Sequence, residues 1–117
     1  MYQLRNVLCT LLFLNFFSNS VFAQTKLPSK EETAGLTKKA TQYMRDANFE
    51  KSLITSRKAL DYATVLNDNN LKAISYNIIG INFNYLAEFD KAILFYKKGL
   101  AHANKTDNDT IKNYLVR

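Results

Sequence analysis

Apolar side chains recur every three or four residues through the second half of the chain. One row is made of Tyr76, Ile79, Gly80, Phe83 and Ala87. The next row is made of Phe89, Ala92, Ile93, Tyr96, Leu100 and Ala103. Because residues at these intervals share one face of a helix, each row predicts a helix with one apolar side.

The first half of the chain carries two similar rows. They are Leu36, Ala40, Tyr43 and Ala47, followed by Phe49, Leu53, Ala59, Leu60 and Ala63. We therefore expect an all-α protein. The expected helices lie near residues 30–46, 48–66, 70–86 and 89–104, with a short one from about 109 to the end.

The pattern returns after 40 residues. Residues 47–54 align with 87–94, and residues 67–72 align with 107–112, so that both helices and loops keep register. A period of this length is typical of stacked helix pairs. An ordinary antiparallel bundle whose halves are similar by chance is the alternative.

Polar residues mark where the helices begin. Ser29, followed three residues later by Glu32, forms a capping-box pattern just after Pro28. Asn and Asp side chains in the 67–70 and 107–109 loops can cap the helices that follow, because they accept bonds from free backbone N–H groups.

These rows resemble the tetratricopeptide repeat family. The matching positions are Tyr76, Ile79, Gly80, Phe83, Ala87, Phe89, Ala92, Tyr96 and Leu100. The resemblance implies a solenoid of antiparallel helix pairs in which Gly80 and Ala92 allow close packing, Phe89 opens the second helix and Tyr96 packs toward the neighbouring unit. The first repeat departs from the family at Lys39, Ser52 and Ser56, where leucine, alanine and an aromatic are usual. The period exceeds the usual length of about 34 residues, so we expect a longer second helix or a longer inter-repeat loop.

The resemblance also implies a domain organisation. A lead-in over residues 24–35 precedes repeat 1 at 36–75, repeat 2 at 76–106 and the start of an incomplete third repeat at 107–117. Repeat arrays need neighbours to cover their apolar faces. The incomplete repeat therefore predicts self-association, or a longer chain of which this is a fragment.

In the family, the first helix of each repeat lines a groove that binds peptides or partner helices. The matching positions are Thr37, Thr41, Met44, Arg45, Asn77, Ile81, Asn84 and Tyr85. Amide and guanidinium groups can bond a peptide, and Tyr85 offers an aromatic platform. Thr37 and Asn77 stand where the family's two-carboxylate clamp needs lysine and arginine, so that clamp is not implied.

The N-terminus has the three parts of a secretory signal peptide. Arg5 precedes an apolar block at residues 7–17, and small residues end at Ala23, before Gln24. The block is shorter than the span of about 20 residues that a bilayer requires. We expect residues 1–23 to be cleaved, giving a periplasmic or secreted bacterial protein that has lost Cys9. A buried helix and an uncleaved anchor are the alternatives.

The sequence offers no catalytic constellation. His102 is the only histidine, the acidic residues are scattered, and there is no Gly-rich phosphate loop. We therefore expect no enzyme activity, no cofactor and no metal.

The formal net charge is +6, but many lysines follow acids directly, as in Glu50-Lys51 and Asp90-Lys91. That pattern is typical of a solvated face, whereas nucleic-acid binding would need a concentrated basic patch. We therefore expect no nucleic-acid partner.

The expected function is therefore an exported, non-enzymatic module that binds a peptide or partner protein. A signal peptide followed by such repeats also resembles the N-terminal sensory part of membrane-bound histidine kinases and transcriptional regulators, and a fragment of such a protein is the alternative. A third reading, a subunit of an exported enzyme, needs a catalytic partner.

Overall fold

The computed structural model describes residues 26–106, which form four α-helices and no strand. The helices are α2 (Lys30–Arg45), α3 (Phe49–Val65), α4 (Asn69–Tyr85) and α5 (Phe89–Ala103). Each begins and ends within one residue of its predicted bounds, so the all-α prediction is confirmed. The predicted signal peptide and the short helix from about 109 lie outside the described residues.

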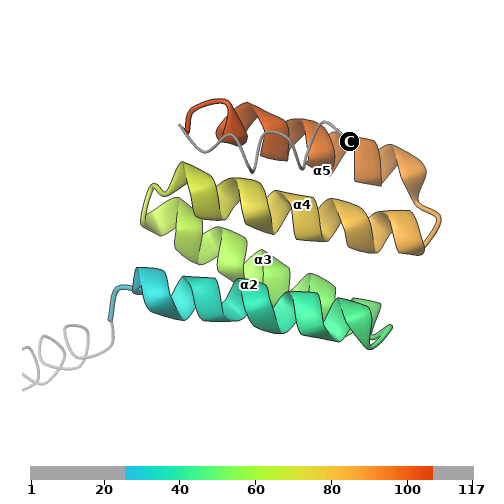
Figure 1. Ribbon diagram of the computed structural model, residues 1–117, viewed down its shortest axis with the longest axis horizontal. Coiled ribbons are helices and arrows are strands. Elements are labelled where there is room, and N and C mark those ends of the chain that lie inside the picture. The colour runs from blue at the N-terminus through green and yellow to red at the C-terminus, as the bar shows by residue number, and fades with distance from the viewer. Residues whose placement is uncertain (1–25, 107–117) are drawn as a thin grey trace, which may run out of the picture.

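The helices pack as two antiparallel pairs (Figure 1). Contacts join α2 to α3, α3 to α4 and α4 to α5, and α2 also contacts α4. In Figure 1, α2 and α4 run in the same direction, as do α3 and α5. The described residues thus form a helical repeat-like architecture.

The three connections between helices are built in the same way. Each has three residues, and the backbone N–H of the third donates to a carbonyl five residues back. The bonds are Asn48 to Tyr43 at 2.8 Å, Asp68 to Ala63 at 3.0 Å, and Glu88 to Phe83 at 2.9 Å. This bond belongs to the Schellman motif, which ends a helix and reverses the chain at once.

The middle residue of each connection has a positive φ, as this motif requires. The angles are 57° at Ala47, 50° at Asn67 and 60° at Ala87. The connection between the two pairs is as short as the connections within them. The extra residues of the 40-residue period therefore lengthen the helices rather than the loops. The helix lengths are 16, 17, 17 and 15 residues.

Side-chain caps fix three of the four helix starts. Ser29 Oγ accepts from the Glu32 N–H at 3.0 Å, and Asp68 Oδ1 accepts from the Leu71 N–H at 3.0 Å. Asn48 caps α3 in the same way, whereas α5 has no side-chain cap. The predicted caps at Ser29 and in the 67–70 loop are confirmed.

Buried positions repeat at the predicted interval of 40 residues. The pairs are Thr33 and Ala73, Ala40 and Gly80, Ser52 and Ala92, Ala59 and Gly99, and Ala63 and Ala103. All ten residues are small, so they allow the helices to approach closely. The periodic core agrees with stacked helix pairs.

Gly80 shows how tight this packing is. A Cβ atom there would lie 2.7 Å from two ring carbons of Tyr96 and 3.3 Å from the Ala92 carbonyl oxygen. Carbon atoms normally pack about 3.5–4.0 Å apart. The α4–α5 contact therefore requires a glycine at this position.

The apolar core is centred on α4. Ile79, Phe83 and Ala92 form its buried cluster. Partly buried side chains pack against the cluster from both neighbouring helices; they are Leu53, Leu60, Phe95 and Tyr96. α4 is thus covered on both sides, by α3 and by α5.

A buried hydrogen-bond chain joins the two helix pairs. Asn82 Nδ2 on α4 donates to Ser52 Oγ on α3 at 2.7 Å, and Ser52 Oγ donates to the Ala40 carbonyl on α2 at 2.8 Å. Ser56 is also buried, and its hydroxyl donates to the Ser52 carbonyl at 2.7 Å. Ser52 and Ser56, which differ from the residues usual in the family, are therefore buried serines whose hydroxyl groups are hydrogen-bonded.

Candidate functional site

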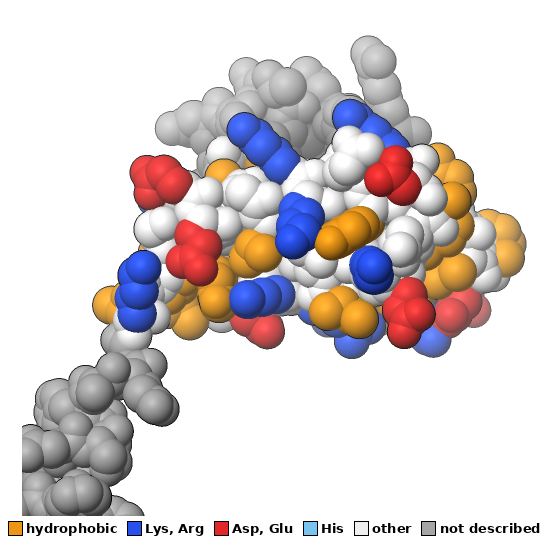
Figure 2. All heavy atoms as spheres, turned by 90° about the horizontal axis from the view of Figure 1, so that it is seen from below, with side chains coloured by type: hydrophobic (Ala, Val, Ile, Leu, Met, Phe, Trp, Pro, Cys, Tyr) orange, Lys and Arg blue, Asp and Glu red, His pale blue; other side chains and the backbone are white. Residues whose placement is uncertain are grey.

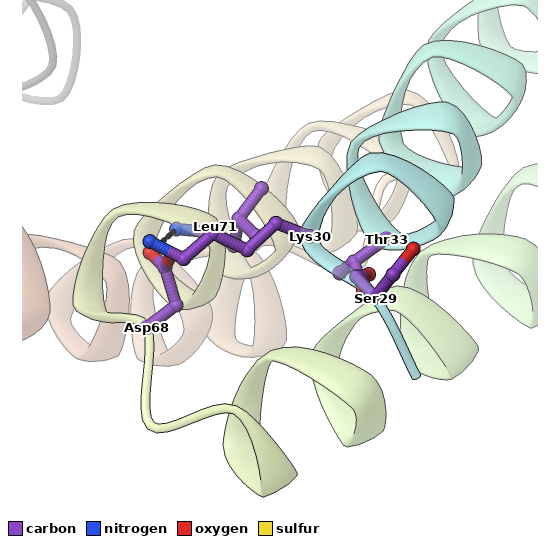
Figure 3. Close-up of polar contacts among 5 residues, drawn as sticks. All are labelled: Ser29, Lys30, Thr33, Asp68 and Leu71. Carbon is purple, nitrogen blue, oxygen red and sulfur yellow. Dashed lines mark hydrogen bonds and ion pairs between the residues drawn. The ribbon is translucent and has the colours of Figure 1, made fainter. Parts of the chain in front are cut away.

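The candidate site is the surface on which α2 and α4 lie side by side, here called the α2–α4 face. One polar link fixes the two helix starts against each other. Lys30 Nζ lies 3.3 Å from Asp68 Oδ2, and the other carboxylate oxygen of Asp68 caps α4 at Leu71 (Figure 3). The Asp68 side chain is only 13% exposed. This shielding makes the ion pair stronger than a fully exposed one.

Two of the predicted site residues turn their hydroxyls back to their own helix. Thr37 is buried, and its Oγ1 donates to the Ala34 carbonyl at 2.8 Å. Thr41 is half-buried and donates to the Thr37 carbonyl at 2.9 Å. Each hydroxyl therefore already donates its hydrogen bond within α2.

The other predicted residues are more accessible. Met44, Asn77 and Ile81 are half-buried, and Arg45 and Asn84 are exposed. The side-chain amides of Asn77 and Asn84 make no hydrogen bond to other described residues. These two amides are thus available to a ligand.

Tyr85 ends α4 and stacks on Phe49, the first residue of α3. The ring centroids lie 5.1 Å apart, and the planes differ by 17°. Tyr85 nevertheless remains 63% exposed. The stack holds the ring in place while much of its surface stays open to solvent, which suits an aromatic binding platform.

The basic side chains do not gather into one patch on the face that Figure 2 shows. Lysine and arginine side chains there lie among acidic and apolar ones. Several lysines also lie over aromatic rings, among them Lys58, 5.4 Å from the Tyr62 centroid, and Lys98, 5.4 Å from that of Phe95. These contacts use the lysines to cover the protein's own rings.

His102 belongs to the packing of α4 against α5. Its Nδ1 lies 3.0 Å from Asn69 Oδ1, and its ring stacks on Tyr76 with centroids 5.5 Å apart. Burial, and then the nearby charges of Lys72 and Lys105, lower the pKa of His102 below its ordinary value. This environment favours the neutral form of the ring.

Residues 26–106 hold no cluster of three or more His, Cys, Asp or Glu side chains that could bind a metal ion. Over the same residues, no helix is long and apolar enough to cross a bilayer.

Comparison of the chain with family models, curated proteins and solved structures gave no match in any of the three.

Two features of this surface were not predicted from the sequence. They are the Lys30–Asp68 ion pair and the stacking of Phe49 on Tyr85. The repeat contained a signal for the second, because Phe49 and Phe89 align at the 40-residue interval and open equivalent helices. Their common position indicated a ring at the edge of each pair but not the ring's partner.

Proposed function

We propose that this protein is an exported, non-enzymatic interaction module that binds a peptide or a partner protein on the α2–α4 face. The proposal includes a solenoid of tetratricopeptide type and cleavage after Ala23. The observation that supports it most directly is the set of side chains that α4 presents on this face. Asn77 and Asn84 offer amides that make no hydrogen bond to other described residues. By their spacing they share one face of α4 with Tyr85, whose ring is stacked on Phe49.

A partner bound to this face would have both apolar contact area and hydrogen bonds available to it. Tyrosine loses little conformational entropy when it is held in place before binding, so its contact area contributes more fully to affinity. The two amides can each donate to and accept from an extended peptide backbone. Because Thr37 is buried, the binding surface is centred on α4 with Met44 and Arg45 at its edge.

The test starts from a peptide selected from a display library on protein purified from a bacterial host that exports it. Binding is then measured for the wild type and for Tyr85→Ala and Asn77→Ala/Asn84→Ala variants. We expect Tyr85→Ala to weaken binding by about tenfold or more, as loss of an aromatic hot spot does. Mass spectrometry of the purified protein checks whether Gln24 is the first residue.

The matched control is Ile54→Ser, because Ile54 is 63% exposed on α3, away from the α2–α4 face. It should leave binding unchanged. If both α4 variants bind every selected peptide as tightly as the wild type, the α2–α4 face is not the binding site.

A further inference from the structure

One buried hydroxyl group joins the two helices that form the α2–α4 face. Ser52 Oγ on α3 accepts from Asn82 Nδ2 on α4 at 2.7 Å and donates to the Ala40 carbonyl on α2 at 2.8 Å. All three residues are fully buried. α2 and α4 are therefore linked through a single oxygen atom, and we call this link the Ser52 bridge.

The Ser52 bridge lies under the half of the α2–α4 face that is proposed to bind a ligand. Its two ends adjoin Thr41 in α2 and Ile81 in α4, which are both candidate site residues. The Lys30–Asp68 ion pair joins the starts of the same two helices. At 1.5 Å per residue, the bridge lies about 15–21 Å further along the helices. The face is thus tied at two well-separated points.

The Ser52 bridge is the firmer of the two ties. The Lys30 side chain is 72% exposed, so salt screens its attraction to the carboxylate. The hydrogen bonds of the bridge are buried, and hydrogen bonds in a chain strengthen one another in a medium of low dielectric constant. Asn82 Nδ2 also donates to the Ile78 carbonyl at 2.8 Å, which holds the amide in the orientation that the bridge needs.

The repeat shows that helix packing alone does not require this hydroxyl. The equivalent of Ser52 forty residues later is Ala92, which is buried against α4. The equivalent of Asn82 is Gln42, which is exposed and donates to the Asp46 side chain at 3.0 Å. An alanine therefore fits the packing position, and the hydroxyl of Ser52 adds the connection between α2 and α4.

We propose that Ser52 and Asn82 are positioning residues that hold α2 and α4 at one separation and thereby keep the α2–α4 face preformed for its ligand. A preformed surface loses less conformational entropy on binding, which raises its affinity. Without the bridge, the two helices adopt a range of separations. Only a fraction of these can bind, and the apparent affinity falls by that fraction. The effect on affinity rests on the function proposed for this face, whereas the effect on helix separation does not.

The test variant is Ser52→Ala/Asn82→Leu, which removes both partners so that no amide is left unpaired in the core. The matched control is Ser56→Ala on the same helix. Ser56 is as deeply buried as Ser52, but its hydroxyl donates to carbonyls of α3 itself. The control therefore removes a buried hydroxyl and leaves the bridge intact.

The separation is measured without a ligand, by double electron–electron resonance between nitroxide labels on α2 and α4. The labels are attached through Lys38→Cys and Asn84→Cys, at two exposed positions. Cys9, the single cysteine of the sequence, lies in the predicted signal peptide. Far-UV circular dichroism checks that each variant is folded. Binding of the peptide selected on the wild type is measured separately, on unlabelled protein.

We expect the wild type and Ser56→Ala to give equally narrow distance distributions, and the double variant to give a broader one. The double variant should bind the peptide about three- to tenfold more weakly, as expected if only part of its population has the binding-competent separation. Ser56→Ala should bind as tightly as the wild type.

A distance distribution of the folded double variant as narrow as that of the wild type would overturn the proposal. Equal broadening by Ser56→Ala would do the same, because the loss of any buried hydroxyl would then suffice. A broader distribution with unchanged peptide affinity would refute the positioning role in binding. If the wild type binds no selected peptide, the function proposed for the face fails, and the distance distributions alone decide whether the bridge sets the separation.

Discussion

The glycines of this chain give a sharp test of the packing, because Gly35 and Gly80 lie in helix interiors with opposite surroundings. A Cβ atom at Gly35 in α2 would meet nothing within 4 Å, whereas one at Gly80 would lie 2.7 Å from the Tyr96 ring. Replacing glycine by alanine in a helix interior stabilises it by about 0.8–1.0 kcal/mol when space is free. Gly35→Ala should therefore raise the free energy of unfolding by about that amount.

Gly80→Ala should lower it. The ring of Tyr96 packs against the core cluster and the Ala92 carbonyl oxygen is backbone, so neither neighbour can move freely. Overpacking of this kind costs about 1–3 kcal/mol. After subtraction of the helix-propensity gain of about 1 kcal/mol, a net loss of about 1 kcal/mol remains, within a range of about 0–2 kcal/mol.

Urea and thermal denaturation followed by far-UV circular dichroism measure both variants. A difference of about 1 kcal/mol shifts the Tm by about 4–8 °C in a domain of this size. In a Tyr96→Ala background, Gly80→Ala should cost less, because the ring carbons are gone and only the contact with the Ala92 carbonyl oxygen at 3.3 Å remains. Equal stabilisation by Gly35→Ala and Gly80→Ala in the wild-type background would refute the close α4–α5 approach.

Three further predictions concern the turns, a cap and pH. Ala47→Gly and Ala87→Gly should each stabilise the fold by about 0.5–1 kcal/mol in urea denaturation, because alanine is strained at positive φ; a loss of stability in both would argue against the left-handed turns. Asp68→Ala should cost about 1–2 kcal/mol through loss of the cap and the ion pair, and Asp68→Asn should cost less because it keeps the cap; equal costs would exclude capping as the cause. The lowered pKa of His102 means that the unfolded chain binds the proton more tightly, so stability should fall as the pH drops through about 6.5, and His102→Gln should remove this part of the pH dependence.

Local sequence determined the helices and their repetition. Apolar spacing, the cap at Ser29 and the turn residues act over a few neighbouring positions, so α2 to α5 could be placed to within one residue. The 40-residue interval likewise marked the small buried positions, such as Ala40 and Gly80.

Only the tertiary structure decided what each helix face contacts. The family resemblance places Thr37 and Tyr85 among the positions that line a groove, but it does not say that Thr37 is buried or that Tyr85 stacks on Phe49. It also could not show that Ser52 is the acceptor for Asn82 across the two helix pairs. These outcomes depend on which neighbouring helix supplies atoms within van der Waals or hydrogen-bond range, and that is a property of the packed chain rather than of any local segment.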